Sequence, residues 1–134
     1  MEMTPESFDT PIIFRAIGYV ENSFTQPAAP EGIRSVESRI IVRAELAQGL
    51  EGLSPGDSLL VLFYFHLSDG YSLLQHLRGD RSRPKRGVFA LRSRRRPNGI
   101  GATVVELVSV RDNVLLVRNL DAIHGTPVLD IKPA

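Results

Sequence analysis

The sequence predicts a mainly β protein, either an antiparallel barrel or a sandwich, formed by a single domain over residues 1–134. About seven short runs rich in Val, Ile, Leu and Phe recur along the chain, and clusters of Gly, Pro, Asn, Asp and Ser separate them. Segments with helical character are confined to residues 47–53 and 71–77, and both are short. A length of 134 residues suits one domain with one core. Together these features favour an antiparallel architecture over an α/β fold.

The first strands are expected at residues 11–20 and 39–46. Residues 11–20 are rich in Ile, Phe and Val. In the second run, apolar residues at positions 40, 42, 44 and 46 alternate with mainly charged residues. This alternation is typical of a strand with one face buried.

Residues 59–65 are apolar on both faces, which predicts a central strand that is covered on both sides. Turn sequences bound this run, with Ser-Pro-Gly-Asp before it and Ser-Asp-Gly after it. Further along, residues 88–91 predict a short strand. Residues 102–110 are expected to pair with 114–120 across a three-residue hairpin loop at 111–113, and residues 127–131 form the last predicted strand.

Composition and missing motifs exclude several kinds of chemistry. The chain has no cysteine, so disulfides, thiolate metal sites and a cysteine nucleophile are ruled out. The standard dinucleotide, phosphate-loop, hydrolase and zinc-protease motifs are absent, and His66, His76 and His124 lack metal-ligand spacing, so we expect no metal site. The N-terminus does not resemble a signal peptide, and no apolar run is long enough to span a bilayer. We therefore expect a cytoplasmic protein that has no membrane association.

Charge is concentrated in residues 78–96. This segment holds nine of the sixteen Lys and Arg residues and one acid, Asp80, whereas the rest of the chain has seven bases and fourteen acids. Such a local excess suggests a polyanionic partner, and the choice of Arg over residues 92–96 suits forked recognition of phosphates. The same charges would also suit a solvated face. Two other features also have both a structural and a functional interpretation. Residues 97–101 form either a plain tight turn or a turn that a ligand approaches closely. His66 is either a site residue or a structural histidine at a rim.

Several ordered sequence blocks resemble one family. They read Gly-Val-Phe-Ala-Leu-Arg-Ser at 87–93, Arg-Pro-Asn-Gly-Ile-Gly at 96–101, Leu-Asp at 120–121 and Gly-Thr-Pro-Val-Leu-Asp-Ile-Lys-Pro at 125–133. Supporting matches lie at 17–20, 49–53 and 65–66. In their order and spacing these blocks resemble the TrmO family, formerly the YaeB-like proteins, over about residues 12–133. The resemblance implies an S-adenosylmethionine-dependent methyltransferase built on a single-sheeted β-barrel, which works as a homodimer and methylates N6 of threonylcarbamoyl-adenosine at position 37 of tRNA.

Two alternatives to that function stay open: a methyltransferase of the same fold that acts on another RNA or a small molecule, and a module that binds cofactor or RNA without catalysis. The sequence also departs from the family pattern. Gly99 stands where the family usually has a second Pro, Arg94 and Arg95 replace a less charged pair, and residues 21–23 read Glu-Asn-Ser in place of Arg-Ser-Pro. Because the sequence stops at Ala134, we expect no C-terminal extension domain.

The resemblance implies cofactor-binding residues, transferred by position: Glu31, Gly32, Ile33, His66, Leu67, Arg92, Ala102, Arg118, Asn119, Leu120 and Asp121. Among these, Asp121 would bind the ribose hydroxyls or the ammonium of the cofactor, and Arg92 would pair with its carboxylate. RNA contacts are expected from the basic segment, at Arg83, Lys85, Arg86, Arg94, Arg95 and Arg96. The lone pair of an exocyclic adenine nitrogen is delocalised, so a group that accepts its N–H should assist transfer, and we expect Asn98 or Asp130 in this catalytic role.

Overall fold

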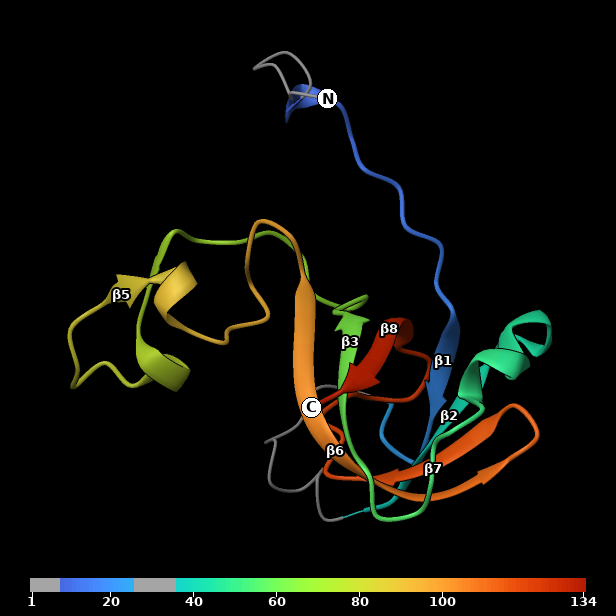
Figure 1. Ribbon diagram of the computed structural model, residues 1–134. Helices are drawn as coiled ribbons and strands as arrows, with labels where there is room; N and C mark the ends of the chain where they lie inside the picture. Colours follow the sequence, from blue (N-terminus) through green and yellow to red (C-terminus); the bar gives the residue numbers. More distant parts are fainter. Residues whose placement is uncertain (1–7, 26–35) are drawn as a thin grey trace.

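The computed structural model describes residues 8–25 and 36–134, which form a closed antiparallel barrel with an arm beside it (Figure 1). The barrel strands follow the order β1-β2-β7-β6-β3-β8, and β8 pairs with β1 to close the ring. Their bounds are β1 Gly18–Glu21, β2 Ser38–Val42, β3 Ser58–Tyr64, β6 Ile100–Arg111, β7 Val114–Arg118 and β8 Pro127–Pro133. The predicted mainly β, single-sheeted barrel is therefore confirmed.

The core fills the inside of the barrel because side chains alternate in direction along each strand. On β3, Leu59, Val61 and Phe63 point inward and are almost completely buried. The other core residues come from every barrel strand and from the loop before β8: Val20, Ile40, Val42, Val105, Leu107, Leu115, Val117, Leu120, Ala122 and Val128.

Two glycines allow the barrel to pack as tightly as it does. A methyl group at Gly18 would lie 2.3 Å from the carbonyl oxygen of Ile41 on the neighbouring strand. At Gly101 it would lie 2.4 Å from the ring of Phe63 and 2.9 Å from the ring of Phe65. No side chain fits at either position without displacing its neighbours, so Gly101 leaves room for both rings at one end of the barrel.

The hairpin of β6 and β7 forms as predicted, but its loop is shorter. Arg111 pairs with Val114, which leaves Asp112 and Asn113 as a two-residue loop. Asp112 adopts the left-handed conformation with φ of 55°, which an Asp tolerates better than most residues. The amide of Asn113 donates a 2.7 Å hydrogen bond to the carbonyl of Val42, and this bond ties the hairpin to β2.

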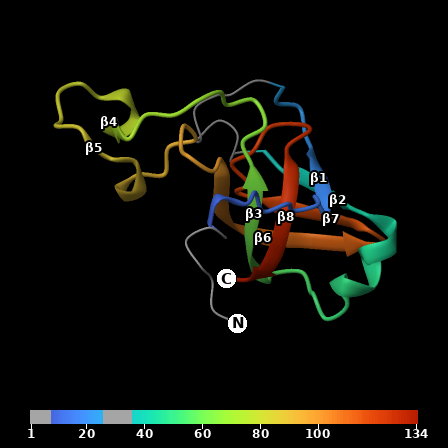
Figure 2. The ribbon, with the colours of Figure 1, turned by 90° about the horizontal axis from the view of Figure 1, so that it is seen from above.

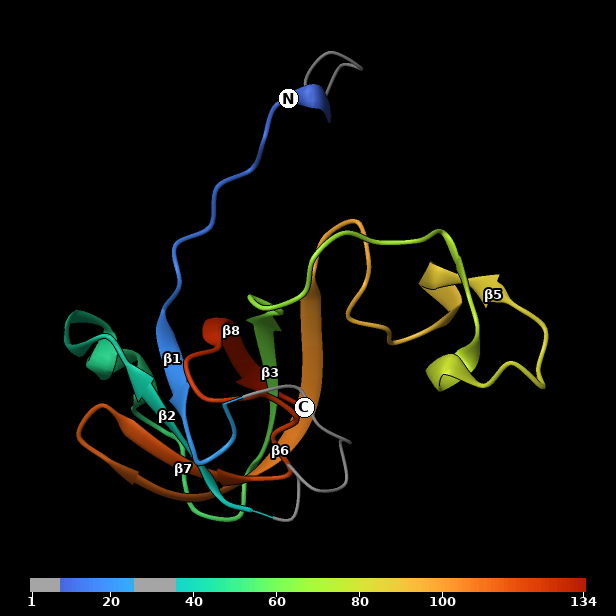
Figure 3. The ribbon, with the colours of Figure 1, turned by 180° about the vertical axis from the view of Figure 1, so that it is seen from behind.

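Between β3 and β6 the chain leaves the barrel and forms an arm, residues 67–99, which projects to one side in all three ribbon views (Figures 1, 2 and 3). The arm contains β4 Leu74–Gln75, η3 Leu77–Gly79, β5 Arg86–Gly87 and η4 Val88–Ala90. Here the sequence-based prediction is wrong twice. Residues 71–77 form no helix, because β4 pairs with β5, and residues 88–91 form no strand, because the chain turns into a 3₁₀ helix at η4.

The N-terminal part of the chain also differs from its prediction. Of the strand expected at 11–20, only the end forms β1, and residues 8–17 run away from the barrel (Figure 3). The strand expected at 39–46 ends at Val42, and the 3₁₀ helix η2, Ala44–Leu50, takes over its last positions and most of the helical segment expected at 47–53. Ile12, Ile13 and Phe14 are left exposed, so apolar composition alone does not make a strand here.

The central strand β3 is covered on one face only, whereas the sequence predicts cover on both. It lies between β6 and β8, as a central strand should. Its outward residues Leu60 and Leu62 are half-buried, and Tyr64 is exposed. The outer face of β3 is therefore only partly covered, and the predicted full cover on both faces is wrong.

Candidate functional site at the barrel rim

Two cavities lie at the end of the barrel where β3 ends and β6 begins. The smaller has a volume of about 70 Å³ and is closed on one side by the loop between β7 and β8, residues 119–126. Its lining consists of Phe63, Phe65, His66, Leu67, Ser68, Arg94, Asp121, Ala122, Ile123 and Thr126. The larger is a groove of about 850 Å³ between the N-terminal segment at 8–16 and the base of the arm at 64–71 and 94–100.

The two cavities share a wall. Phe65, Ser68 and Arg94 line both of them, and no other residue of the described ranges does. One layer of side chains therefore separates a group bound in the smaller cavity from a group bound in the groove. This is the arrangement that a transfer reaction between two ligands needs, because proximity and alignment supply much of its rate.

Aromatic rings form the apolar part of the smaller cavity. The rings of Phe63 and Phe65 meet edge to face, with centroids 5.3 Å apart and planes at 79°. Phe63 is buried in the core, while Phe65 reaches out to the rim. The rings join the cavity directly to the rigid barrel core and keep water out of it on that side.

Polar groups converge on the same cavity from three segments. Asp121 comes from the 119–126 loop, Arg94 from the arm, and His66 and Ser68 from the chain that follows β3. A carboxylate, a guanidinium and an imidazole in one apolar pocket suit a ligand that carries hydroxyls and charges of both signs. Among residues 8–25 and 36–134, no three His, Asp or Glu side chains gather in a way that would hold a metal ion. The same residues include no helix with the length and apolar character that a membrane crossing requires.

Asn22 fastens the loop that carries Asp121. Its side-chain amide donates to the carbonyl of Ala122 at 2.9 Å and to the hydroxyl of Ser38 at 3.1 Å, and its oxygen accepts from the N–H of Phe24 at 3.0 Å. The backbone N–H of Asn22 also donates to Nδ1 of His124 at 3.3 Å. One side chain therefore joins the end of β1, the start of β2 and the wall of the cavity.

The residues expected to bind cofactor divide into three groups. His66, Leu67 and Asp121 line the smaller cavity. Leu120 is part of the barrel core, Ala102 points to the outside of the barrel, Arg92 is exposed on the arm, and neither cavity includes them. Arg118 and Asn119 also line neither cavity, and Glu31, Gly32 and Ile33 lie outside the described residues.

Arg118 and Asn119 shape the approach to the cavity without lining it. The guanidinium of Arg118 forms ion pairs with Glu37 at 3.2 Å and with Glu106 at 3.3 Å, both on the outside of the barrel. Asn119 adopts a left-handed conformation with φ of 72°, which turns the chain at the end of β7. This turn buries Leu120 in the core and directs Asp121 to the rim.

The two catalytic candidates lie apart. Asn98 is exposed at the groove, and its side-chain amide makes no hydrogen bond to any described residue. Asp130 lies on the outer face of β8, where it pairs with Lys132 at 3.1 Å, and neither cavity includes it. The strand register places Asp130 opposite Leu62, which is opposite Ala102, so all three share one outward row.

The residues expected to bind RNA occupy two places. Arg94 and Arg96 line the groove, and the half-buried guanidinium of Arg96 also donates to the carbonyls of Leu91 and Ser93 at 3.0 Å each. The others, Arg83, Lys85, Arg86 and Arg95, are exposed on the arm.

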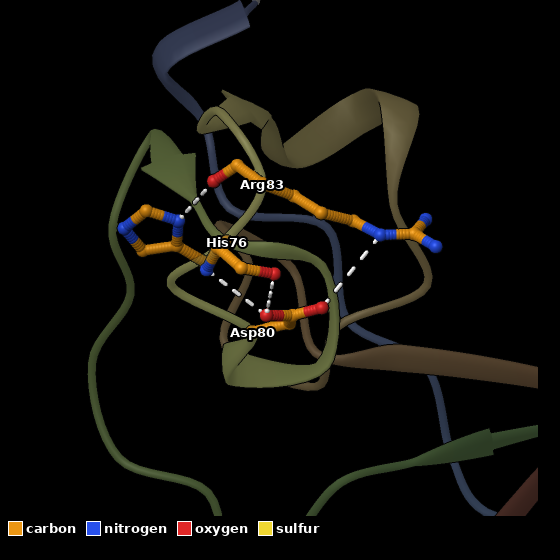
Figure 4. A network of polar contacts seen from close by, with 4 residues as sticks. His76, Asp80 and Arg83 are labelled. Carbon is orange, nitrogen blue, oxygen red and sulfur yellow. Dashed lines mark hydrogen bonds and ion pairs between the residues drawn. The ribbon is translucent and has the colours of Figure 1, made fainter.

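Hydrogen bonds hold the turn of the arm that leads into the basic stretch at 83–86 (Figure 4). Asp80 accepts bonds from the hydroxyl and the N–H of Ser82, at 2.6 and 3.0 Å, and these bonds hold the pKa of its carboxyl below the ordinary value. Arg83 approaches the same carboxylate at 3.6 Å, and its carbonyl contacts Nδ1 of His76 at 2.8 Å. The turn in the basic segment is therefore held in a defined conformation by these contacts.

Several residues of the cavity were missed by the reasoning from sequence: Phe63, Phe65, Ser68, Ile123, Thr126 and, behind the wall, Asn22. Phe63 and Phe65 had a usable signal, because residues two apart on a strand face the same way and His66 was already expected at the strand end. Asn22 had none, since its partners are far away in the sequence, with Ala122 a hundred positions further on.

The fold and the site define a ligand-binding β-barrel in which a small mixed-polarity cavity opens beside a groove with basic residues. A family model described as the tRNA-methyltransferase O N-terminal domain matches residues 18–134. A probable S-adenosyl-L-methionine-binding protein of Methanothermobacter thermautotrophicus is 40% identical over 128 residues, which cover 93% of this chain and 91% of the relative. The human tRNA (adenine(37)-N6)-methyltransferase is 34% identical over 133 residues, which cover 91% of this chain and 30% of the human protein.

A solved structure agrees with these similarities. The crystal structure of TrmO from Pseudomonas aeruginosa superposes with a TM-score of 0.72 at 30% identity, covering 93% of this chain and 56% of that chain. The chain belongs to the TrmO family. It spans little more than half of the crystallised TrmO chain and under a third of the human protein.

Proposed function

We propose that this chain is an S-adenosylmethionine-dependent methyltransferase that acts on N6 of adenosine 37 in tRNA. The observation that carries the proposal is the wall of Phe65, Ser68 and Arg94 between the smaller cavity and the groove. Family membership supports the choice of cofactor and acceptor, because relatives are named for binding S-adenosylmethionine and for methylating tRNA at this atom.

The smaller cavity fits part of this cofactor. Asp121 is suited to its ribose hydroxyls or its ammonium, and Arg94 to its carboxylate, in the role that the sequence suggested for Arg92. Pockets for molecules of this size usually measure about 300–1,000 Å³, so the remainder of the cofactor would extend past the shared wall into the groove. When bound, S-adenosylmethionine supplies a methyl group that an in-line displacement can transfer.

The groove would hold the acceptor, with the side-chain oxygen of Asn98 accepting a hydrogen bond from the N6–H, and the proton released on methylation would pass to water. The free amide of Asn98 faces this groove, and Tyr64 and Tyr71 line it with aromatic faces that suit a nucleobase. We assign the role to Asn98 in preference to Asp130, whose carboxylate is paired with Lys132 on the outer face. For the finer substrate, threonylcarbamoyl-adenosine, the support is a second arginine at the groove, Arg96, which would lie beside its carboxylate.

The test is methyl transfer by the purified chain from labelled S-adenosylmethionine to tRNA, with nucleosides analysed by mass spectrometry. We expect label on the N6 of adenosine 37, with a strong preference for tRNA that carries the threonylcarbamoyl group. Asn98→Ala should lower kcat about 10²-fold with the cofactor Kd unchanged, within the range for the loss of one oriented hydrogen bond at the reacting group. Asn98→Asp, which keeps an acceptor oxygen, should recover part of the rate. Label on another RNA or on a small molecule, or a larger loss in Asp130→Ala than in Asn98→Ala, would contradict the assignment.

We also propose that two copies pack through the outer face of β6 and β3. Val104 is 53% exposed there, next to half-buried Leu60 and Leu62, which makes an apolar surface on the outside of the barrel. Val104→Glu should convert a dimer into a monomer in light scattering coupled to gel filtration. Leu46→Glu, an equally apolar exposed position on η2, is the matched control and should leave the dimer intact. A wild-type monomer at micromolar concentration would refute this arrangement.

A further inference from the structure

Phe89 is the most exposed aromatic residue of the arm. Its side chain is 78% exposed in η4, between two neighbours that are buried, Val88 and Leu91. Most Phe side chains are buried because an apolar ring is unfavourable in water. One exposed ring does not by itself indicate a binding site, so its surroundings must identify the partner.

Hydrogen bonds fix the backbone around Phe89, so its side chain projects from a defined position on the arm. The N–H of Val88 donates to the carbonyl of Leu73 at 2.8 Å, which joins η4 to the residue just before β4, and the N–H of Leu91 donates to the carbonyl of Val88 at 3.1 Å. Val88 and Leu91 are the buried apolar residues of the arm. Together they anchor both ends of the turn and leave its middle residue pointing outward.

The charges around Phe89 favour an anionic partner. The arm carries nine Lys and Arg residues against two acids, Asp69 and Asp80, and the carboxylate of Asp80 is engaged by Ser82 and Arg83. Arg86 and Arg92 flank η4 in the chain, and both are exposed. Unpaired RNA matches this surface, since it offers phosphates to the arginines and flat base faces to the ring. The arm of a second copy would bring like charges together.

We propose that Phe89 is a stacking platform for an unpaired base of the RNA substrate, which the arm holds while the target adenosine enters the groove. This inference rests on the proposed tRNA methyltransferase function. It distinguishes two tasks within the arm: the arginines supply attraction that is independent of sequence and falls with salt, and the ring supplies a preference for unpaired over paired RNA.

The experiment compares the binding of two fluorescent RNAs, a hairpin with a seven-nucleotide loop and a fully paired duplex of equal length, by anisotropy at several salt concentrations. Phe89→Ala should weaken hairpin binding about 5- to 100-fold, because one base stack is lost, and should leave duplex binding and the salt slope unchanged. Phe89→Trp should bind the hairpin within about threefold of wild type. The control Arg92→Ala should weaken both RNAs alike and reduce the salt slope by roughly 0.7–0.9.

The outcomes separate the failure of this inference from that of the proposed function. Equal hairpin affinity in Phe89→Ala and wild type would overturn the stacking role while leaving the methyltransferase intact. So would a change from dimer to monomer in Phe89→Ala, which would make the ring a contact between copies. Absence of both RNA binding and methyl transfer in the wild-type protein would overturn the proposed function itself, and the inference with it. Unchanged cofactor affinity and circular dichroism in each variant show that the fold is retained.

Discussion

The barrel and the arm of this protein differ in what holds them together. The barrel has a continuous core of thirteen buried apolar residues supplied by all six strands and the loop before β8, whereas the described arm buries two, Val88 and Leu91. The arm depends instead on hydrogen bonds from side chains, such as those of Gln75 to the carbonyls of Ser72 and Arg95 at 2.7 and 2.6 Å. A segment with so little buried surface is free to carry charge and exposed rings that a core could not accommodate.

This difference explains where the site lies. The cavity needs rigid walls, and it takes Phe63, Phe65 and Asp121 from the barrel and its loop. The groove and its surroundings need a surface that attracts a polyanion, and this comes from the arm, which holds more than half of the basic residues. Arg94 joins the two, because it lies at the base of the arm and lines both cavities.

The largest expected effect is on stability, and it should be confined to the barrel. Leu115→Ala removes a fully buried side chain from the core and should lower the free energy of unfolding by about 2–5 kcal/mol. Val88→Ala should lower the free energy of unfolding less than half as much, because Val88 packs within the arm and not in the barrel core. It should also weaken RNA binding. Urea denaturation followed by circular dichroism measures both variants. Equal losses would mean that arm and barrel unfold as one cooperative unit.

Next in size is the contrast between two arginines that are two residues apart. Arg94→Ala should weaken cofactor binding about 10- to 100-fold, because a charge-assisted contact is worth about 1.5–3 kcal/mol. Arg92→Ala should leave the cofactor Kd within about twofold, since Arg92 lines neither cavity. Isothermal titration with S-adenosylmethionine compares them directly. A larger loss in Arg92→Ala would restore the assignment that the sequence suggested.

A smaller effect is expected from Asn22, which supports the cavity without touching its content. Asn22→Ala removes three side-chain hydrogen bonds, frees the 119–126 loop and should weaken cofactor binding about tenfold, or about 1.4 kcal/mol. The matched control is Asn113→Ala, which removes a bond between loop and strand at the opposite end of β7 from Asp121. It should lower stability by a similar amount with no change in cofactor affinity. If the two variants bind cofactor equally well, Asn22 is merely structural.

The smallest effect concerns Gly99, at the joint between arm and barrel. This glycine has no positive φ, and a methyl group there would meet the ring of Tyr64 at 3.5 Å, an ordinary contact. Gly99→Ala should therefore raise the free energy of unfolding by about 0.4–1 kcal/mol through the unfolded state. The melting temperature and methyl-transfer rate test this. A loss of stability would mean that the turn needs the freedom of glycine after all.

The sequence predicted the barrel much better than the arm, for a physical reason. Barrel strands are rich in Val, Ile, Leu and Phe because they pack against the core, and such runs stand out in the sequence at residues 59–65 and 102–110. The conformation of the arm depends on bonds such as the one from Gln75 to the Arg95 carbonyl, twenty residues away, which leave no periodic trace. Residues 71–77 and 88–91 were accordingly assigned the wrong structure.

The site could be predicted only where a residue follows a recognisable strand or motif. His66 was expected at a rim because it follows the apolar run at 59–65, Asp121 was expected from the family resemblance, and both line the smaller cavity. The choice between Arg92 and Arg94 depends on the path of a loop, which sequence spacing does not determine. Ala102, which the resemblance implies as a cofactor contact, faces outward, since Gly101 and Thr103 on either side of it are the residues that face inward, and its role stays a prediction.

One pair of titrations tests the central claim, that the barrel rim binds the cofactor while the arm binds RNA. In the combined variant Arg83→Ala, Lys85→Ala and Arg86→Ala, three exposed charges of the arm are removed. We predict a cofactor Kd within about twofold of wild type, together with a tRNA affinity whose salt slope is smaller by roughly 2–3. If the affinities for cofactor and tRNA instead fall together, or if the salt slope stays the same, the claim that the rim binds cofactor and the arm binds RNA is wrong.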